Sequence, residues 1–276
     1  EGFTFDAGPT IVTAPFLFEE LWSLAGARFE DDVDLRLMDP FYRIRFHDGL
    51  TFDYSGDRDR VREQIAALSP RDADGYDRFM KASEAIYRVG FEQLGHVPFD
   101  RWTDMAKIVP DMIRLGSHRT VYGMVAKHIR DERVRQVLSF HPLLIGGNPF
   151  DSSSIYTLIS FLERQWGVWS AMGGTGAIVD AMARLVERVG GEIEYRADVE
   201  EIHVENGRAA GVRLSGGRRL DADVVVSNAD AAWTYRRLVD AGHRRRWTDR
   251  RIERARFSSG LFVWYFGTKG TFPEVP

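Results

Sequence analysis

The sequence contains no cysteine. This absence excludes a disulfide framework, a thiolate metal site and a cysteine nucleophile. With 276 residues, the chain exceeds the usual single-domain length of roughly 100–150 residues and is long enough to fold around a buried core without crosslinks. Its composition, 44% hydrophobic and 12% aromatic, is typical of a globular protein.

Long hydrophobic runs are also missing. The longest covers residues 261–266, six residues against the roughly 20 that a membrane-spanning helix needs, so no such helix is predicted. Lysine and arginine number 37 and acidic residues 41, a net charge of −4. No overall positive field therefore draws the chain to nucleic acid, and no nucleic-acid partner is expected.

Several catalytic signatures are absent as well. No two histidines stand four residues apart, which argues against a metal site, and none is expected. The sequence has no Gly-x-Ser-x-Gly turn and no P-loop, so hydrolase and phosphotransferase functions lose most of their support. The histidines are scattered at positions 47, 96, 118, 128, 141, 203 and 243.

The first 165 residues divide into two patterns. Residues 1–60 read mainly as strands and turns, with a short helix marked by Phe18 and Trp22 and a hairpin whose turn contains Asp48-Gly49. From about residue 57 helical patterns dominate: a helix beginning at Ser69-Pro70, two or three more within residues 102–140, and another over residues 154–165.

The remaining residues return to a mixed pattern. An amphipathic helix follows Gly173-Gly174-Thr175-Gly176 and ends at Gly190-Gly191. Four strands are predicted next, over residues 192–195, 199–204, 210–214 and 220–227, with turns at Asn206-Gly207 and 215–217. The last is apolar enough for a buried strand that ends near a ligand.

Two features allow alternative interpretations. The glycines at 173–176 could cradle a pyrophosphate at a helix N-terminus, but Val179 stands where that fingerprint has Gly or Ala, which favours a tight helix entry. Residues 101–135 carry eight Lys/Arg and four acids among many apolar residues. That stretch is either a solvated helical face or a surface that docks on anionic lipid.

The motifs in their order resemble the bacterial-type phytoene desaturases, FAD-dependent enzymes with an amine-oxidase-like flavoprotein fold. The resemblance covers essentially the whole chain. It rests on five motifs: residues 2–10 (GFTFDAGPT), 40–43 (PFYR), 148–158 (which contains NPF and SSIYTL), 173–177 (GGTGA) and 227–230 (SNAD).

The resemblance implies a mixed α/β fold of the Rossmann-like, amine-oxidase-like type. Residues 1–15 and 168–240 would belong to the FAD-binding domain, residues 40–56 and 257–276 to a substrate-domain sheet, and residues 57–167 to a helical cap that faces the membrane. An N-terminal Rossmann unit and a C-terminal FAD segment would lie outside the chain, whose ends both look cut from a longer protein, so the fragment alone is expected to bind FAD poorly and to be inactive.

The resemblance also implies functional residues. Asp6, Gly8, Pro9 and Thr10 would lie beside the flavin, with Val199 at the adenine and Ser227 and Asn228 near the cofactor. Asp104 matches an acidic position proposed to lie near the reacting polyene. Its basic partner position holds Lys107, where relatives carry Arg, which puts a paired acid–base role in doubt because Lys lacks the planar fork of Arg. A solvated helix N-cap is the plain alternative for Asp104.

The implied activity is desaturation of phytoene, an apolar C40 polyene, toward neurosporene or lycopene by a cytoplasmic enzyme peripherally bound to a membrane. A hydrocarbon offers no charged group to grip, so an apolar tunnel and a well-placed flavin matter more than an acid–base pair. Three alternatives stay open: another carotenoid-acting flavoprotein such as a ketolase or isomerase, a non-catalytic lipid-binding module, and a nicotinamide oxidoreductase that uses Gly174-x-Gly176.

Overall fold

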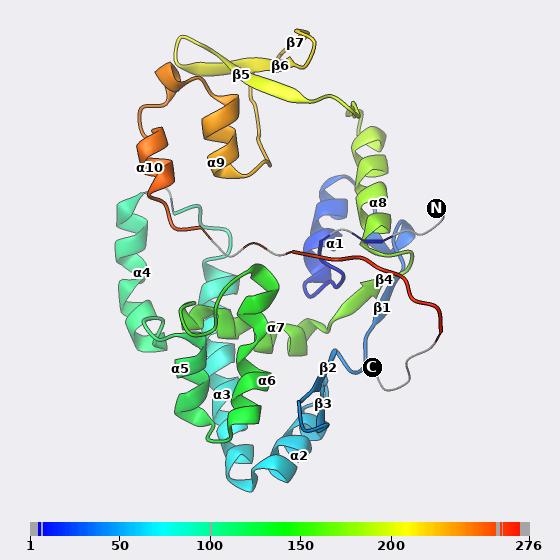
Figure 1. Ribbon diagram of the computed structural model, residues 1–276, viewed down its shortest axis with the longest axis vertical. Coiled ribbons are helices and arrows are strands. Elements are labelled where there is room, and N and C mark those ends of the chain that lie inside the picture. Colours follow the sequence, from blue (N-terminus) through cyan, green and yellow to red (C-terminus); the bar gives the residue numbers. More distant parts are fainter. Residues whose placement is uncertain (1–4, 7, 100, 258–259, 261, 271–276) are drawn as a thin grey trace. The chain divides into compact units, whose positions relative to one another are not determined.

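Two units make up the chain, and each is described by itself (Figure 1). The computed structural model describes residues 5–6, 8–99, 101–257, 260 and 262–270. The first unit runs to Val189 and includes the segment after residue 258, and the second begins at Gly190.

Helices dominate the first unit, as the periodicity predicts. Side-chain oxygens of Asp57, Thr120 and Asp131 accept backbone N–H bonds at the starts of three of them, which satisfies donors that the first turn leaves unpaired. The α-helices are α1 (Pro15–Leu24), α2 (Arg58–Leu68), α3 (Ala73–Tyr87), α4 (Trp102–Leu115), α5 (Val121–His128), α6 (Glu132–Ser139), α7 (Leu158–Trp166) and α8 (Thr175–Arg188). Shorter segments are the 3₁₀ turns η1 (Phe29–Asp31), η2 (Pro70–Asp72), η4 (His141–Ile145) and η5 (Ser154–Thr157), and the π-helical η3 (Arg88–Gln93).

Two small antiparallel sheets complete this unit. Strands β2 (Tyr42–Arg45) and β3 (Thr51–Tyr54) form the predicted hairpin, and Gly49 adopts the positive φ of +84° that its turn requires. Strands β1 (Leu35–Leu37) and β4 (Trp169–Ala171) pair although they lie far apart in sequence.

The first unit has two apolar clusters. One packs the β2–β3 hairpin against α2, α3, α5 and α6 around Phe52, Ile65 and Phe79. The other joins α1 to α8 through Trp22, Phe29 and Ile178. Both clusters follow the apolar stripes of the helices, which bury one face each.

A buried carboxylate links three elements of this unit. Glu163 on α7 accepts a 2.7 Å hydrogen bond from the Tyr42 hydroxyl on β2, and its other oxygen lies 3.0 Å from His141 Nε2 in η4. Glu163 and His141 are almost completely buried. Burial and the adjacent carboxylate raise the pKa of the Tyr42 hydroxyl, so Tyr42 remains a donor.

Asp72 forms a second buried polar joint. Its two oxygens accept the backbone N–H groups of Arg130 (2.9 Å) and Asp131 (2.7 Å), which ties the start of α3 to the start of α6. Burial alone would raise the pKa of this carboxyl, but these backbone hydrogen bonds favour its charged form and hold the pKa below its usual value.

The second unit is a three-stranded antiparallel meander followed by short helices. Asn206 and Gly207 both have positive φ, as the predicted two-residue turn between the first two strands requires. Its elements are β5 (Val199–Glu205), β6 (Arg208–Leu214), β7 (Arg219–Asp221), α9 (Ala231–Trp233), the π-helical η6 (Thr234–Leu238), the 3₁₀ turn η7 (Ala241–His243) and α10 (Asp249–Glu253).

Two of the predicted strands are wrong. Residues 192–195 form no strand, and the strand predicted over 220–227 ends at Asp221, leaving Val224 and Val226 75% and 89% exposed. The Ala222 N–H still bonds to the Ala210 carbonyl of β6 at 3.0 Å. An isolated extended segment needs a neighbouring strand for its backbone groups, and no described strand pairs with residues 223–227. Residues 262–266 are likewise outside any strand and exposed, whereas Leu261 lies outside the described residues.

The Asp72 joint predicts a pH-dependent stability. We expect Asp72→Asn to lower the free energy of unfolding at pH 7 by about 1–3 kcal/mol, because one buried backbone N–H loses its acceptor. A lowered folded-state pKa gives stability that is present above the unfolded pKa of roughly 3.9 and is lost as the pH falls through the folded value.

The difference between wild type and Asp72→Asn should therefore shrink below about pH 4 in urea titrations. Asp74→Asn, on the exposed side of the same helix, is the control and should change stability by less than about 0.5 kcal/mol at either pH. An Asp72→Asn deficit that stays constant down to pH 3 would contradict the assignment.

Candidate functional site

The N-terminal motif and the glycine-rich turn meet in the first unit. The Asp6 carboxylate accepts the backbone N–H groups of Thr175 (3.1 Å) and Gly176 (3.2 Å), and the Thr175 hydroxyl donates to the Pro9 carbonyl (2.9 Å). Residues 6–10 are held next to β4 because Val12 and Trp169 exchange two backbone hydrogen bonds of 2.8 Å. Two motifs that lie more than 160 residues apart therefore form one surface.

Asp6 decides between the two interpretations of the glycine cluster. Its carboxylate takes up the free amides at the positive end of α8, which are the groups that a pyrophosphate would use. A Cβ added to Gly174 would lie 2.3 Å from an Asp6 oxygen, so the glycine is needed for this close approach. The structure favours the tight helix entry over a dinucleotide cradle at residues 173–176.

The other end of α8 is also fixed by an acid. Arg188 in the last turn donates to Asp32 (2.9 Å), which also accepts the indole N–H of Trp22 (2.7 Å). These two hydrogen bonds hold the pKa of the Asp32 carboxyl below its usual value. Helix α8 is thus positioned at both termini relative to residues 6–10.

Gly8, Pro9 and Thr10 present an open backbone. Gly8 has a φ of +102°, and a Cβ placed there would meet nothing within 4 Å. All three residues are exposed. A planar group can therefore approach this backbone closely, which fits the expected position beside a flavin, whereas Ala7 lies outside the described residues.

Val199, Ser227 and Asn228 belong to the second unit. Val199 opens β5, which pairs only with β6 among the described strands, so the outer edge of β5 is open to a ligand. The Ser227 hydroxyl lies 2.8 Å from the Thr234 hydroxyl, and Asn228 is exposed. Each position is compatible with cofactor binding, but that these residues share one site with residues 6–10 stays a prediction.

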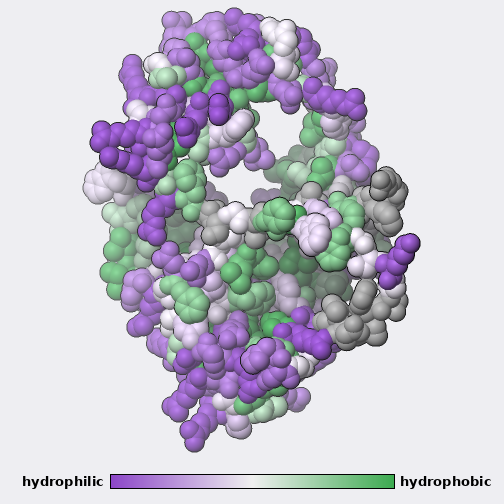
Figure 2. Space-filling model, in the orientation of Figure 1, coloured by the Kyte–Doolittle hydropathy of each residue, from purple (hydrophilic) through white to green (hydrophobic). Residues whose placement is uncertain are grey.

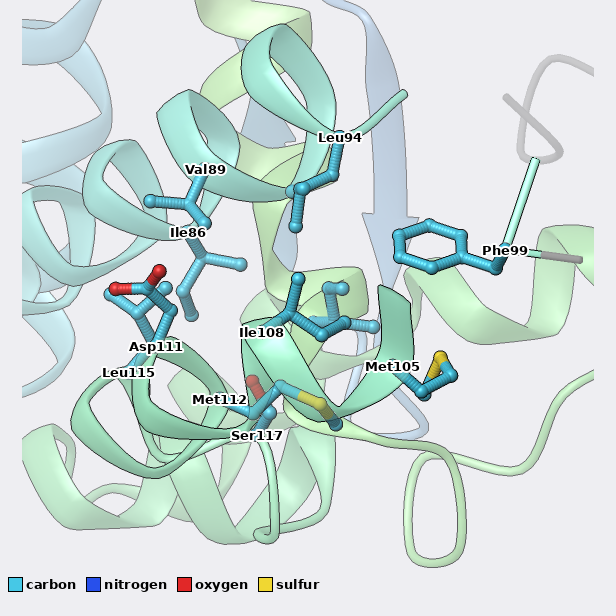
Figure 3. Close-up of a pocket in the computed structure, with 12 residues that line it drawn as sticks. Ile86, Val89, Leu94, Phe99, Met105, Ile108, Asp111, Met112, Leu115 and Ser117 are labelled. Carbon is cyan, nitrogen blue, oxygen red and sulfur yellow. The ribbon is translucent and has the colours of Figure 1, made fainter. Parts of the chain in front are cut away.

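An apolar cavity of about 230 Å³ lies between α3, η3 and α4 (Figure 3). Ile108 and Met112 of α4 face the side chains of Ile86, Val89 and Leu94 across it. Its wall includes two unusual backbone features, the π-helical η3 and Phe99 with a φ of +50°. The lining residues are Ile86, Val89, Gly90, Leu94, Phe99, Met105, Ile108, Asp111, Met112, Leu115, Ser117 and Ile155.

Asp104 lies near this cavity without lining it. It is partly buried in the first turn of α4, where its carboxylate pairs with Lys107 Nζ at 3.3 Å. The N-cap of α4 is Arg101, so the alternative of Asp104 as the N-cap is wrong. A carboxylate in the first turn still interacts favourably with the helix dipole, and a catalytic role stays a prediction. The carboxylate that does line the cavity is Asp111, which pairs with Arg114 at 2.8 Å.

Sequence reasoning missed Asp111, although a signal was available. It stands seven residues after Asp104, two helical turns along one face of α4, and shares that partly buried face with Ile108 and Met112.

The opposite face of α4 exposes an apolar stripe. Trp102 is 81% and Ile113 is 66% exposed, with Val109 between them. Figure 2 shows the hydrophobic surface over this helix. Among the described residues, no helix is both long and apolar enough to span a bilayer, and no three His, Asp or Glu side chains gather as metal ligands.

Comparison with known proteins places the chain in a family. Residues 1–274 match the family model of the flavin-containing amine oxidoreductases. The chain belongs to this family. The match confirms the predicted flavoprotein family, the mixed α/β fold class and FAD as the cofactor.

Similar proteins carry the names of carotenoid desaturases. The chain is 47% identical to a neurosporene-forming phytoene desaturase of Cereibacter sphaeroides, with 100% of the chain and 54% of the relative aligned. It is 48% identical to a lycopene-forming phytoene desaturase of Pseudescherichia vulneris, over 97% of the chain and 54% of the relative. The chain therefore spans about half the length of the curated relatives it matches.

A solved structure supports the fold alone. The PF1083 protein from Pyrococcus furiosus superposes with a TM-score of 0.53 at 17% identity, covering 87% of this chain and 49% of that one.

The contact between Asp6 and Gly174 predicts a site-specific destabilisation. Gly174→Ala should lower the melting temperature by more than Gly190→Ala does, because both glycines have a positive φ but only Gly174 faces a carboxylate. Gly174 also has a ψ of 176°, a backbone conformation that costs an alanine about 1–3 kcal/mol, and displacement of Asp6 from the α8 amides adds about 0.5–2 kcal/mol.

Thermal unfolding followed by circular dichroism measures both losses. In an Asp6→Ala background, the part of the Gly174→Ala loss that comes from the Asp6 contact should disappear, leaving the backbone strain of Gly174 itself. A Gly174→Ala loss of the same size in the wild-type and Asp6→Ala backgrounds would show that the Asp6 contact is not stabilising.

Proposed function

We propose that this chain is the central part of an FAD-dependent desaturase that removes hydrogen from phytoene, an apolar C40 polyene, toward neurosporene or lycopene. The observation that carries the proposal is the apolar cavity beneath α4, in a member of a flavin family whose similar proteins are named phytoene desaturases. A hydrocarbon substrate is held by apolar contacts, and the lining of the cavity supplies them for one segment of the C40 chain.

FAD, when bound, supplies the redox chemistry by accepting the hydrogen removed from two adjacent carbons as a double bond forms. The open backbone at Gly8, Pro9 and Thr10 would hold the flavin side, with Asp6 fixing that segment to α8. Val199, Ser227 and Asn228 would hold the remainder of the cofactor.

The domain division follows the same proposal. Residues 1–15 and 168–240 would serve FAD binding, residues 40–56 and 257–276 the substrate-domain sheet, and residues 57–167 the helical cap. The helical character of α2 to α7 and the β2–β3 hairpin support the cap and part of the sheet. The exposed valines at 224 and 226 would then be covered by strands from elsewhere in a longer protein.

Product analysis tests the substrate and the reaction together. A protein that carries this chain at the full length of its relatives, supplied with FAD and phytoene-loaded vesicles, should yield extracted pigment with new long-wavelength, fine-structured absorption bands. The band positions count the double bonds added. Bound flavin without colour would overturn the substrate and favour a ketolase or isomerase, and absence of flavin would overturn the proposal altogether.

A cavity-filling substitution tests the location of the substrate. In the same full-length protein, Met112→Trp should lower kcat/KM for phytoene roughly tenfold or more while flavin absorption per mole of protein is unchanged, because the indole occupies the apolar cavity. Val179→Trp on the exposed face of α8 is the control and should leave kcat/KM near the wild-type value. Equal activity of the two variants would place the substrate elsewhere.

We also propose that the outer face of α4 contacts the membrane that dissolves the substrate. Its exposed tryptophan, its aliphatic stripe and the flanking Lys107 and Arg114 are the pattern of an interfacial helix.

Vesicle cosedimentation checks this contact. Trp102→Ala/Ile113→Ala should weaken binding to vesicles roughly tenfold or more, because two large apolar side chains leave the interface. Leu24→Ala/Leu37→Ala removes similarly exposed apolar surface outside α4 and should bind as wild type does. If the α4 variant binds vesicles as strongly as the wild type, the proposed contact between α4 and the membrane is wrong.

A further inference from the structure

Arginine dominates the second unit between η6 and the end of α10. Residues 236–256 contain nine arginines and three acidic residues, a local charge of +6 in a chain whose net charge is −4. This segment lies outside the cavity, the N-terminal motif and the 101–135 stretch. Figure 2 shows hydrophilic side chains over the part of the unit that carries α10.

Each of the three acidic side chains of this segment already has a hydrogen-bond or ion-pair partner within the segment. Asp249 pairs with Arg244 at 2.6 Å, Glu253 pairs with Arg236 at 3.7 Å, and Asp240 accepts the backbone N–H of Gly242 at 2.8 Å. Four other arginines of the segment form no ion pair, because no carboxylate of the described residues lies within 4.0 Å of any of them. These four, all exposed, are Arg245, Arg246, Arg250 and Arg254.

Two of these arginines, Arg250 and Arg254, line a hollow beside Trp247. Trp247 stacks on Tyr235 with ring centroids 5.5 Å apart, and the Arg251 guanidinium lies 4.9 Å from the Trp247 ring centroid. The hollow has a volume of about 540 Å³ and is lined by Trp247, Thr248, Arg250, Arg251, Arg254 and Ala255, all of them exposed. The buried Ile252 anchors α10 beneath it.

This arrangement has an energetic cost that an anion would offset. Unpaired guanidinium groups at successive turns of one short helix repel one another, and a bound anion replaces that repulsion by attraction. A phosphate group matches the planar donor fork of arginine better than a single-point acceptor does.

We propose that this surface, centred on Arg250, Arg254 and Trp247, binds the phosphate groups of anionic phospholipids at a bilayer surface. The hollow is open to solvent rather than enclosed, which suits a flat, repeating array of headgroups. Trp233, 55% exposed under the Arg237 guanidinium, and Trp247 add indoles of the kind that settle at the level of lipid headgroups. The inference extends the proposed function by adding a charge-dependent contact with the membrane that supplies an apolar substrate.

The test compares unpaired with paired arginines of the same unit. Arg250→Gln/Arg254→Gln should weaken binding of the 276-residue chain to phosphatidylglycerol-containing vesicles roughly 10- to 30-fold, because each arginine near an anionic surface contributes about 1 kcal/mol. Arg218→Gln/Arg219→Gln removes the same charge from arginines that already pair with Glu194 and Glu205, and should bind nearly as wild type does. Binding of the wild type should fall steeply between 0.05 and about 0.5 M salt and be weak on pure phosphatidylcholine.

Three results would overturn the proposal: unchanged binding of Arg250→Gln/Arg254→Gln, equal loss in both arginine pairs, or displacement from vesicles by millimolar inorganic phosphate, which would indicate a soluble phosphate ligand. The readouts separate this proposal from the proposed function. If the α4 variant Trp102→Ala/Ile113→Ala loses vesicle binding while the arginine variants do not, only the proposal for the arginine surface is overturned. Flavin binding and pigment formation test the proposed function independently of vesicle binding.

Discussion

The buried carboxylate of Glu163 is the constraint on which the first unit depends. A charge removed from water is costly unless hydrogen bonds and an opposite charge or dipole surround it. Tyr42 and His141 meet this need from β2 and η4, so the hairpin, the turn before the NPF motif and α7 must come together in one arrangement. Since α7 packs against α3, the same requirement sets the wall of the apolar cavity.

Neighbouring polar contacts extend this framework along α7. Arg164 donates to the Tyr76 hydroxyl at 3.1 Å, and the indole N–H of Trp166 lies 3.0 Å from the Tyr87 hydroxyl, both on α3. The helix pair is thus held by hydrogen bonds at several levels as well as by apolar packing. Such a scaffold leaves α4 free to lie over the cavity with one face inward and its apolar stripe outward.

Local signals in the sequence were enough to predict most elements. Helices and hairpins form where they are expected because they depend on nearby residues. These local signals are the apolar periodicity, the capping residues and the turns at Asp48-Gly49 and Asn206-Gly207. The errors arise where structure depends on a distant partner. Residues 222–227 have the composition of a buried strand, yet composition cannot supply the neighbouring strand that such a segment needs.

The same distinction applies to the candidate site. Resemblance to a family indicated Asp6 and the glycine cluster separately, but only the fold shows that the carboxylate of one occupies the helix amides of the other. Asp111 was not predicted as a site residue, because a single acid on an amphipathic helix cannot be told from an ordinary surface residue without the cavity beside it.

The open edge of β5 has a consequence for the solution behaviour of the protein. An unpaired strand edge is a template for the strand of another molecule, and the exposed valines that follow β7 supply apolar surface for such an association. An adenine bound along that edge at Val199 would occupy the same backbone groups. If the adenine binds there as proposed, cofactor loading would also protect this stretch of main chain from association with another molecule.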